Sequence, residues 1–286
     1  MRLWLGLAAA VVAAAPAAAQ VDEQAAVGEV VRLVRERYVV AEKRAATIER
    51  LQASLASGRY GEDPQAFAAR VTEDLRAVTQ DGHMSLNHDP GQAAALGVRT
   101  SDETRTGAYW EARARSINHG VVELKILPGD VRYMNLVGFV WTGDESRQAM
   151  TDAMRFLGGG KAAIIDLRSN GGGSPESVRY LTSHFVPAGT HLIDFDMPEG
   201  DTRSVAEAEL PAGRMIGKPL YVLTSGHAAS AAEEFASHVA LFKLGELVGE
   251  TTVGAAHRND LFPVAGGFMA SISVGRPIRP VSKGNW

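Results

Sequence analysis

The spacing of hydrophobic and polar residues divides the chain into a helical part and a part in which strands and helices alternate. Over residues 27–78, apolar residues recur every three or four positions, which predicts three helices that each bury one face. Asp63-Pro64 predicts the start of the third helix, because aspartate caps helices and proline suits their first turn. The pattern therefore predicts a helical bundle over residues 20–90.

After residue 90 the pattern changes. Residues 91–118 are rich in Gly, Ser and Thr, and we expect them to form a linker loop. The following segment, "GVVELKILPGDVRYMNLVGFV", predicts two strands joined at Pro128-Gly129-Asp130. Strands and helices alternate from there on, which favours a parallel sheet with crossover helices. The predicted fold class is α/β (α+β), in which the helical bundle packs on a mainly parallel ββαβ-type core over residues 119–286.

The first nineteen residues carry a different signal. Arg2 precedes an apolar stretch that ends in Ala17-Ala18-Ala19, the pattern of a secretory signal peptide. A membrane anchor is the alternative, but the apolar run is short and is broken by Pro16. We therefore expect a periplasmic or secreted protein without stable membrane insertion after the signal peptide is removed.

Composition narrows the chemistry. The formal net charge is −4 and no basic run is present, so the sequence lacks the electrostatic footprint of a nucleic-acid-binding protein. The chain has no cysteine, so any nucleophile must be an oxygen or a nitrogen. None of the eight histidines has the HxH or HExxH spacing of a zinc site. We expect neither a metal nor a cofactor.

One serine stands out. In "LTSGHAASAAEEFA", a predicted strand turns into a helix at Ser230, with small alanines on both sides. The free N–H groups of a helix N-terminus could stabilise an oxyanion there, so Ser230 is a candidate nucleophile. Glu233 follows three residues later, and a capping box explains the same pattern. The residues alone leave both interpretations open.

A second feature is "IIDLRSNGGGS", in which a buried strand runs into three glycines and then a helix. Ligands of open α/β sheets bind beyond such strand ends, and glycine lets a backbone N–H approach a ligand closely. The segment has neither the GxGxxG nor the Gly-Lys-Ser/Thr pattern of a phosphate loop. An oxyanion donor and a simple tight turn fit it equally well.

Together these segments are similar to the tail-specific (C-terminal processing) serine peptidase family, in the branch related to interphotoreceptor retinoid-binding protein. The resemblance covers most of residues 27–286 and rests on five segments in the family's order: "TQDGHMSL", "GVVELKILPGDVRYMNLVGF", "AIIDLRSNGGGS", "YVLTSGHAASAAEEFA" and "VGETTVGAAH". It implies an exported serine peptidase that forms an acyl-enzyme on peptide or protein substrates. Ser230 would be the nucleophile and His83 the base, preferred over His227 and His257, with oxyanion donors in the backbone of Ala231 and Gly172.

The chain also departs from the family. Ala255-Ala256 stand where the processing peptidases carry a lysine, and too few residues separate His83 from the core for a PDZ domain. The family's orienting glutamate would follow Trp286, where this sequence stops, so we expect a C-terminally truncated, weakly active peptidase. The resemblance leaves two alternatives, a non-catalytic carrier of apolar ligands and a degenerate, inactive homologue. It implies neither a substrate specificity nor an oligomeric state.

Overall fold

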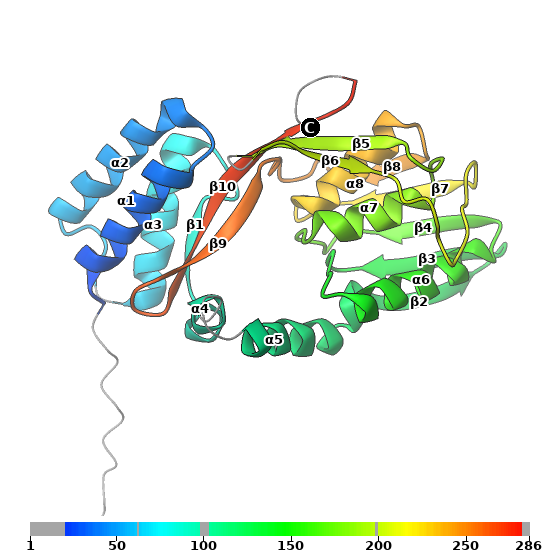
Figure 1. Ribbon diagram of the computed structural model, residues 1–286, viewed down its shortest axis with the longest axis horizontal. Coiled ribbons are helices and arrows are strands. Elements are labelled where there is room, and N and C mark those ends of the chain that lie inside the picture. The colour runs from blue at the N-terminus through cyan, green and yellow to red at the C-terminus, as the bar shows by residue number, and fades with distance from the viewer. Residues whose placement is uncertain (1–20, 62, 98–102, 198–199, 282–286) are drawn as a thin grey trace, which may run out of the picture.

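A computed structural model describes residues 21–61, 63–97, 103–197 and 200–281. The predicted signal peptide and Asn285-Trp286 lie outside these residues. Figure 1 shows two lobes, a helical lobe and an α/β lobe, connected below by two helices and above by long strands. The lobes correspond to two separate clusters of buried hydrophobic side chains.

The helical lobe contains the predicted bundle. Its helices are α1 (Glu23–Arg37), α2 (Ala41–Ala56) and α3 (Pro64–Thr79). As predicted, Asp63 caps α3, accepting a hydrogen bond from the Ala66 N–H at 2.7 Å. The core of this lobe is not made by helices alone, because Phe268, Ala270 and Ile272 from the far end of the chain are buried against them.

These distant residues belong to a sheet that the sequence did not predict. It contains β1 (Ser85–His88), β5 (His191–Asp196), β6 (Thr202–Val205), β9 (Arg258–Val264) and β10 (Phe268–Ile278). Strand β10 pairs with β1 and β9 along one half and with β5 at its end. The predicted boundary is therefore wrong in one respect: residues 258–278 lie with the bundle and not wholly in the 119–286 core.

The α/β lobe matches the prediction. Its sheet has the order β2-β3-β4-β7-β8, formed by β2 (Val121–Leu127), β3 (Val131–Leu136), β4 (Ala162–Asp166), β7 (Leu220–Thr224) and β8 (Glu246–Gly249). Only β2 and β3 are antiparallel, joined by the predicted turn, and the other neighbours are parallel. The helices α6 (Asp144–Gly158), α7 (Pro175–Ser183) and α8 (Ala231–Leu241) share a hydrophobic core with it. The fold is thus a mixed α/β fold.

Residues 91–118, predicted to be a linker loop, contain α4 (Pro90–Gly97) and α5 (Glu103–Ser116), followed by the short 3-10 helix η2 (Asn118–Gly120). The prediction of a loop is wrong because it overlooked local helix signals. Asp89 accepts a hydrogen bond from the Gln92 N–H at 2.9 Å, and a run of alanines follows Pro90. These helices form the lower connection between the lobes in Figure 1.

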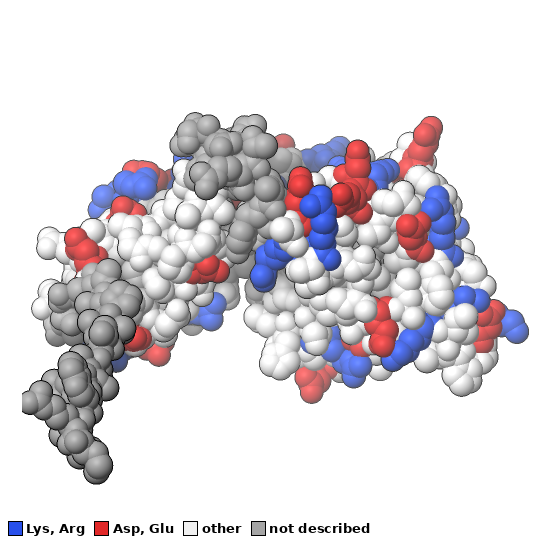
Figure 2. Space-filling model, turned by 90° about the horizontal axis from the view of Figure 1, so that it is seen from below, with Lys and Arg blue, Asp and Glu red and all other residues white. Residues whose placement is uncertain are grey.

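The surface carries both signs of charge. On the face shown in Figure 2, Lys and Arg side chains alternate with Asp and Glu, and no large area of one sign forms. Among the described residues, no helix combines the length and the apolar character needed to cross a membrane. The described residues also contain no group of three or more His, Asp or Glu side chains arranged to hold a metal ion.

Candidate active site

Ser230 occupies a strained position between β7 and α8. Its φ of 54° lies in the left-handed region, which residues other than glycine rarely adopt. The turn before it is held by the Ser225 hydroxyl, which donates to the Arg168 carbonyl at 2.6 Å. Strain of this kind persists where the surroundings over-determine the backbone, and it is frequent at active sites. The predicted cap is confirmed, because Ser230 is the N-cap of α8.

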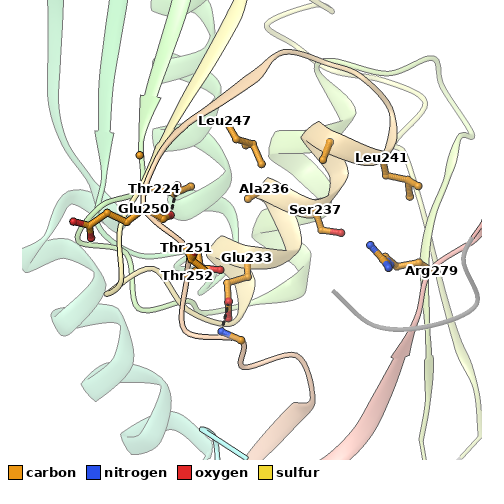
Figure 3. A pocket seen from close by; sticks show the side chains of 13 residues that line it. Thr224, Glu233, Ala236, Ser237, Leu241, Leu247, Glu250, Thr251, Thr252 and Arg279 are labelled. Atoms are coloured by element: carbon orange, nitrogen blue, oxygen red, sulfur yellow. Dashed lines mark hydrogen bonds between the residues drawn. The ribbon is translucent and has the colours of Figure 1, made fainter.

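Glu233 stabilises this conformation. It is buried, and its Oε2 accepts the Ser230 N–H at 2.8 Å, as the predicted capping box requires. The same carboxylate also accepts the N–H groups of Gly254 at 2.6 Å and Ala255 at 2.8 Å. Figure 3 shows its side chain pointing from α8 toward the loop that follows Thr252. Glu233 therefore ties the loop after β8 to the backbone of the candidate nucleophile.

The glycine run lies against this turn. Gly172 has a φ of +108°, and a Cβ there would stand 2.8 Å from Ser230 Cβ and 3.2 Å from the Ala231 nitrogen. Such distances are too short for a side chain, so only glycine fits this position without a shift. The parallel bridge between Gly173 and Phe139 fixes the run on its other side. The sequence-predicted residues Ser230, Ala231 and Gly172 are thus brought together.

The predicted oxyanion donors differ in whether their backbone N–H groups already have a hydrogen-bond acceptor. Ala231 is the first residue of α8, and its N–H has no acceptor among the described residues. The N–H of Gly172, in contrast, donates to Asn170 Oδ1 at 2.9 Å. The next residue, Gly173, has an N–H without an acceptor in the described part of the chain. The assignment of Gly172 as the second donor stays a prediction.

The helical lobe reaches this turn through the segment between α3 and β1. A Cβ at Gly82 would be 3.5 Å from Ala255 Cβ, so the segment touches the loop that Glu233 holds. The Asp81 carboxylate is buried and accepts the His83 N–H through Oδ1 at 3.0 Å and His257 Nδ1 through Oδ2 at 2.8 Å. Burial alone would raise the pKa of Asp81, but the hydrogen bonds from His257 and from the His83 N–H hold it below its usual value.

His83, the predicted base, lies at this junction. Burial lowers its pKa, against the attraction of the Asp81 charge, and its Nδ1 is buried without a hydrogen-bond partner in the described residues. In the described part of the chain, no hydrogen bond joins the Ser230 hydroxyl to any imidazole. The role of His83 therefore stays a prediction.

A cavity of about 310 Å³ opens at Ser230. Its lining includes Ser230, Ala231 and His257, whereas His83 is not part of it. Acidic groups from three elements, Glu176, Glu234 and Asp260, line it together with Arg258 and the aromatic rings of Trp141 and Phe195. Burial, reinforced by the charge of Glu176, raises the pKa of Glu234 to about 8. No pattern in the sequence indicated Glu234, because its burial arises from packing between elements.

A larger cavity of about 780 Å³ lies beside α8, between this helix, β8 and Arg279 (Figure 3). Glu233 borders it, and Ser237 reaches it from the same helix. The Ser237 hydroxyl is buried without a hydrogen-bond partner among the described residues. This cavity is separate from the one lined by Ser230: α8 and the loop after β8 border both, but the two have no described lining residue in common.

Comparison with known proteins assigns the family. The model of peptidase family S41 matches residues 130–284, which is more than half of the chain. The chain belongs to peptidase family S41. A stretch of 113 residues, 39% of this chain, is 33% identical to the carboxy-terminal processing protease CtpA of Bacillus subtilis. The match spans only 24% of the length of that protein.

Solved structures share the fold. The photosystem II D1 C-terminal processing protease has a TM-score of 0.53 and 17% identity, covering 93% of this chain and 90% of its own. A lipoprotein from Streptococcus agalactiae has a TM-score of 0.59 and 15% identity, covering 92% of this chain and 88% of its own. At these identities the likeness concerns the fold, which places this S41 chain among two-lobed α/β proteins of the same architecture.

Proposed function

We propose that this S41 protein is a serine-type peptidase that cleaves peptides or proteins through an acyl-enzyme. The observation that carries the proposal is the position of Ser230, strained at the N-terminus of α8 and open to a cavity. Two features favour catalysis over capping alone. The neighbouring Ala231 N–H has no acceptor among the described residues, and Gly172 lets a second backbone segment approach the serine.

The reaction follows from these groups. A histidine takes the proton of the Ser230 hydroxyl while its oxygen attacks the substrate carbonyl, and water later releases the acyl group. The Ala231 N–H holds the oxyanion together with a glycine of the 171–173 run. Gly172 is the glycine that the resemblance implies. Its N–H now donates to Asn170 Oδ1, and it would have to leave this acceptor to donate to the oxyanion. The resemblance gives the role of base to His83.

The setting of the enzyme follows from the sequence. Residues 1–19 support export, so we infer a periplasmic or secreted peptidase. The short connection between the lobes supports the branch without a PDZ domain, since residues 91–118 hold only α4, α5 and the start of η2 in their described part.

A fluorophosphonate probe tests the proposed nucleophile, because it labels activated serines. We expect labelling of the full chain, and complete loss of it in Ser230→Ala with an unchanged melting temperature. Ser237→Ala is the matched control, since this serine lies on the same helix and its hydroxyl bonds to no described residue. Equal labelling of Ser230→Ala, or a folded wild-type chain that resists the probe and instead binds retinol or a fatty acid, would contradict the proposal.

A further inference from the structure

The structure contains a carboxylate–imidazole pair that the sequence did not predict. Asp81, at the end of the helical bundle, and His257, beyond β8, are 176 positions apart and come from opposite lobes. Nδ1 of His257 lies 2.8 Å from Oδ2 of Asp81. The Asp81 side chain is only 4% exposed, whereas His257 is 23% exposed, so the pair runs from the buried junction toward solvent.

The exposed end of this pair and the candidate nucleophile border one cavity. His257 and Ser230 line the same cavity of about 310 Å³. Because Glu233 Oε2 accepts the N–H groups of both Ser230 and Ala255, at 2.8 Å each, one carboxylate oxygen fixes the serine backbone and the loop that carries His257. His257 is two positions beyond Ala255, with only Ala256 between them, which leaves the imidazole little freedom relative to Ser230.

This geometry suits a general base better than that of His83. A neutral imidazole whose Nδ1–H is held by a carboxylate presents the lone pair of Nε2 as an acceptor, and the carboxylate stabilises the imidazolium that forms. His257 has such a partner in Asp81. The Nδ1 of His83 is buried without a partner among the described residues, and His83 does not line the cavity.

We propose that His257 is the general base for Ser230 and that Asp81 is the positioning acid that orients it. The proposal rests on the function proposed above and names further residues for the same site. Asp81 supplies the acid of this pair from the segment between α3 and β1.

The proton movements balance in each step. The Ser230 proton passes to Nε2 of His257 as Oγ bonds to the substrate carbonyl carbon, and the carbonyl π electrons move onto the oxygen. When the intermediate collapses, the C–N bond breaks and the Nε2 proton passes to the leaving amine. In deacylation a water proton goes to Nε2 as its oxygen bonds to the acyl carbon, and it returns to Ser230 Oγ when the ester C–O bond breaks.

The rate constant for fluorophosphonate labelling of Ser230 in the full chain separates the two histidines. His257→Asn keeps a donor near the Nδ1 position, and so the contact with Asp81, but removes Nε2. We expect it to slow labelling by about 10²–10⁴-fold. His83→Asn tests the alternative base that the resemblance implies, and we expect it to slow labelling far less than His257→Asn does. His257→Gln serves as a second variant if His257→Asn does not fold.

The role of Asp81 is tested by comparing its substitution in the wild-type chain with the same substitution in the His257→Asn variant. Alone, Asp81→Asn should slow labelling by about 10²-fold or more, whereas in the His257→Asn background it should add less than about threefold, because it acts through the imidazole. Asp81→Glu should restore part of the rate. A merely structural Asp81 would lower the rate equally in both backgrounds, together with the melting temperature.

The outcomes distinguish the proposals. If His257→Asn and His257→Gln label at the wild-type rate, or if His83→Asn alone abolishes labelling, His257 is not the base and this inference is wrong while Ser230 remains the nucleophile. If the wild-type chain is not labelled at Ser230, the proposed function itself fails. A rate lost in His257→Asn and kept in His83→Asn supports the pair.

Discussion

Glu234 lies in the first turn of α8, directly after Glu233. It is buried and lines the cavity at Ser230, facing the charge of Glu176, and its pKa is raised to about 8. At neutral pH its side chain is therefore mostly a neutral acid that can donate a hydrogen bond.

The free energy of unfolding should depend on pH because Glu234 binds its proton more tightly in the folded protein. Between the ordinary carboxyl value of 4.5 and about 8, the folded protein keeps the Glu234 proton that the unfolded chain has lost. Stability therefore falls as the pH rises through this window. Glu234→Gln should remove the fall and stabilise the protein by about 4 kcal/mol at pH 9, with little change at pH 4. Urea denaturation of both proteins at the two pH values tests this, and parallel curves would refute it.

At the scale of elements, the site depends on the contact between the turn after β4 and the turn before α8. Gly172→Ala would place a Cβ 2.8 Å from Ser230 Cβ at a φ of +108°. We expect a loss of stability of about 2 kcal/mol and at least tenfold slower labelling of Ser230, since the alanine forces the two turns apart. Melting curves and labelling rates measure the two effects.

The neighbouring glycine provides the control. A Cβ at Gly171 would meet nothing within 4 Å, so Gly171→Ala should leave both the melting temperature and the labelling rate close to those of the wild type. If both alanine variants behave alike, the turn tolerates a side chain at position 172, and the close packing of Gly172 on Ser230 is not required for the site.

At the scale of the whole molecule, buried histidines limit stability on the acid side. His184 and His238 belong to the α/β lobe, and burial lowers the pKa of each to about 4 from an ordinary 6.5. The unfolded chain gains these protons first, so stability falls as the pH drops from about 6.5 to about 4. Each histidine contributes on the order of 3 kcal/mol to this fall.

The effects of Glu234 and of the two buried histidines together predict how stability depends on pH. Because Glu234 lowers stability toward pH 8 and the two histidines lower it toward pH 4, the free energy of unfolding should be greatest near pH 6.5. Guanidinium denaturation followed by tryptophan fluorescence measures the profile. A stability that stays constant from pH 7 to pH 4.5 would show that the histidines are not held neutral.

Local patterns determined the elements of this protein and much of its turn chemistry. The cap of α3 at Asp63, the strand turn at residues 128–130 and the capping box of Ser230 with Glu233 each join residues within four positions, so their signals survive in a single sequence. The mainly parallel sheet followed from the alternation of strands and helices. The predicted loop over residues 91–118 failed even locally, because its alanine-rich helix signal was overlooked.

Only the tertiary structure decided what lies around Ser230. Strand β10 completes the helical core by pairing with β1, about 180 residues earlier in the chain, and its end pairs with β5. The contact of Asp81 with His257 and the burial of Glu234 likewise depend on how distant segments pack. No periodicity records such contacts, because a carboxylate two positions from one histidine can serve another that is 176 positions away once the chain has folded.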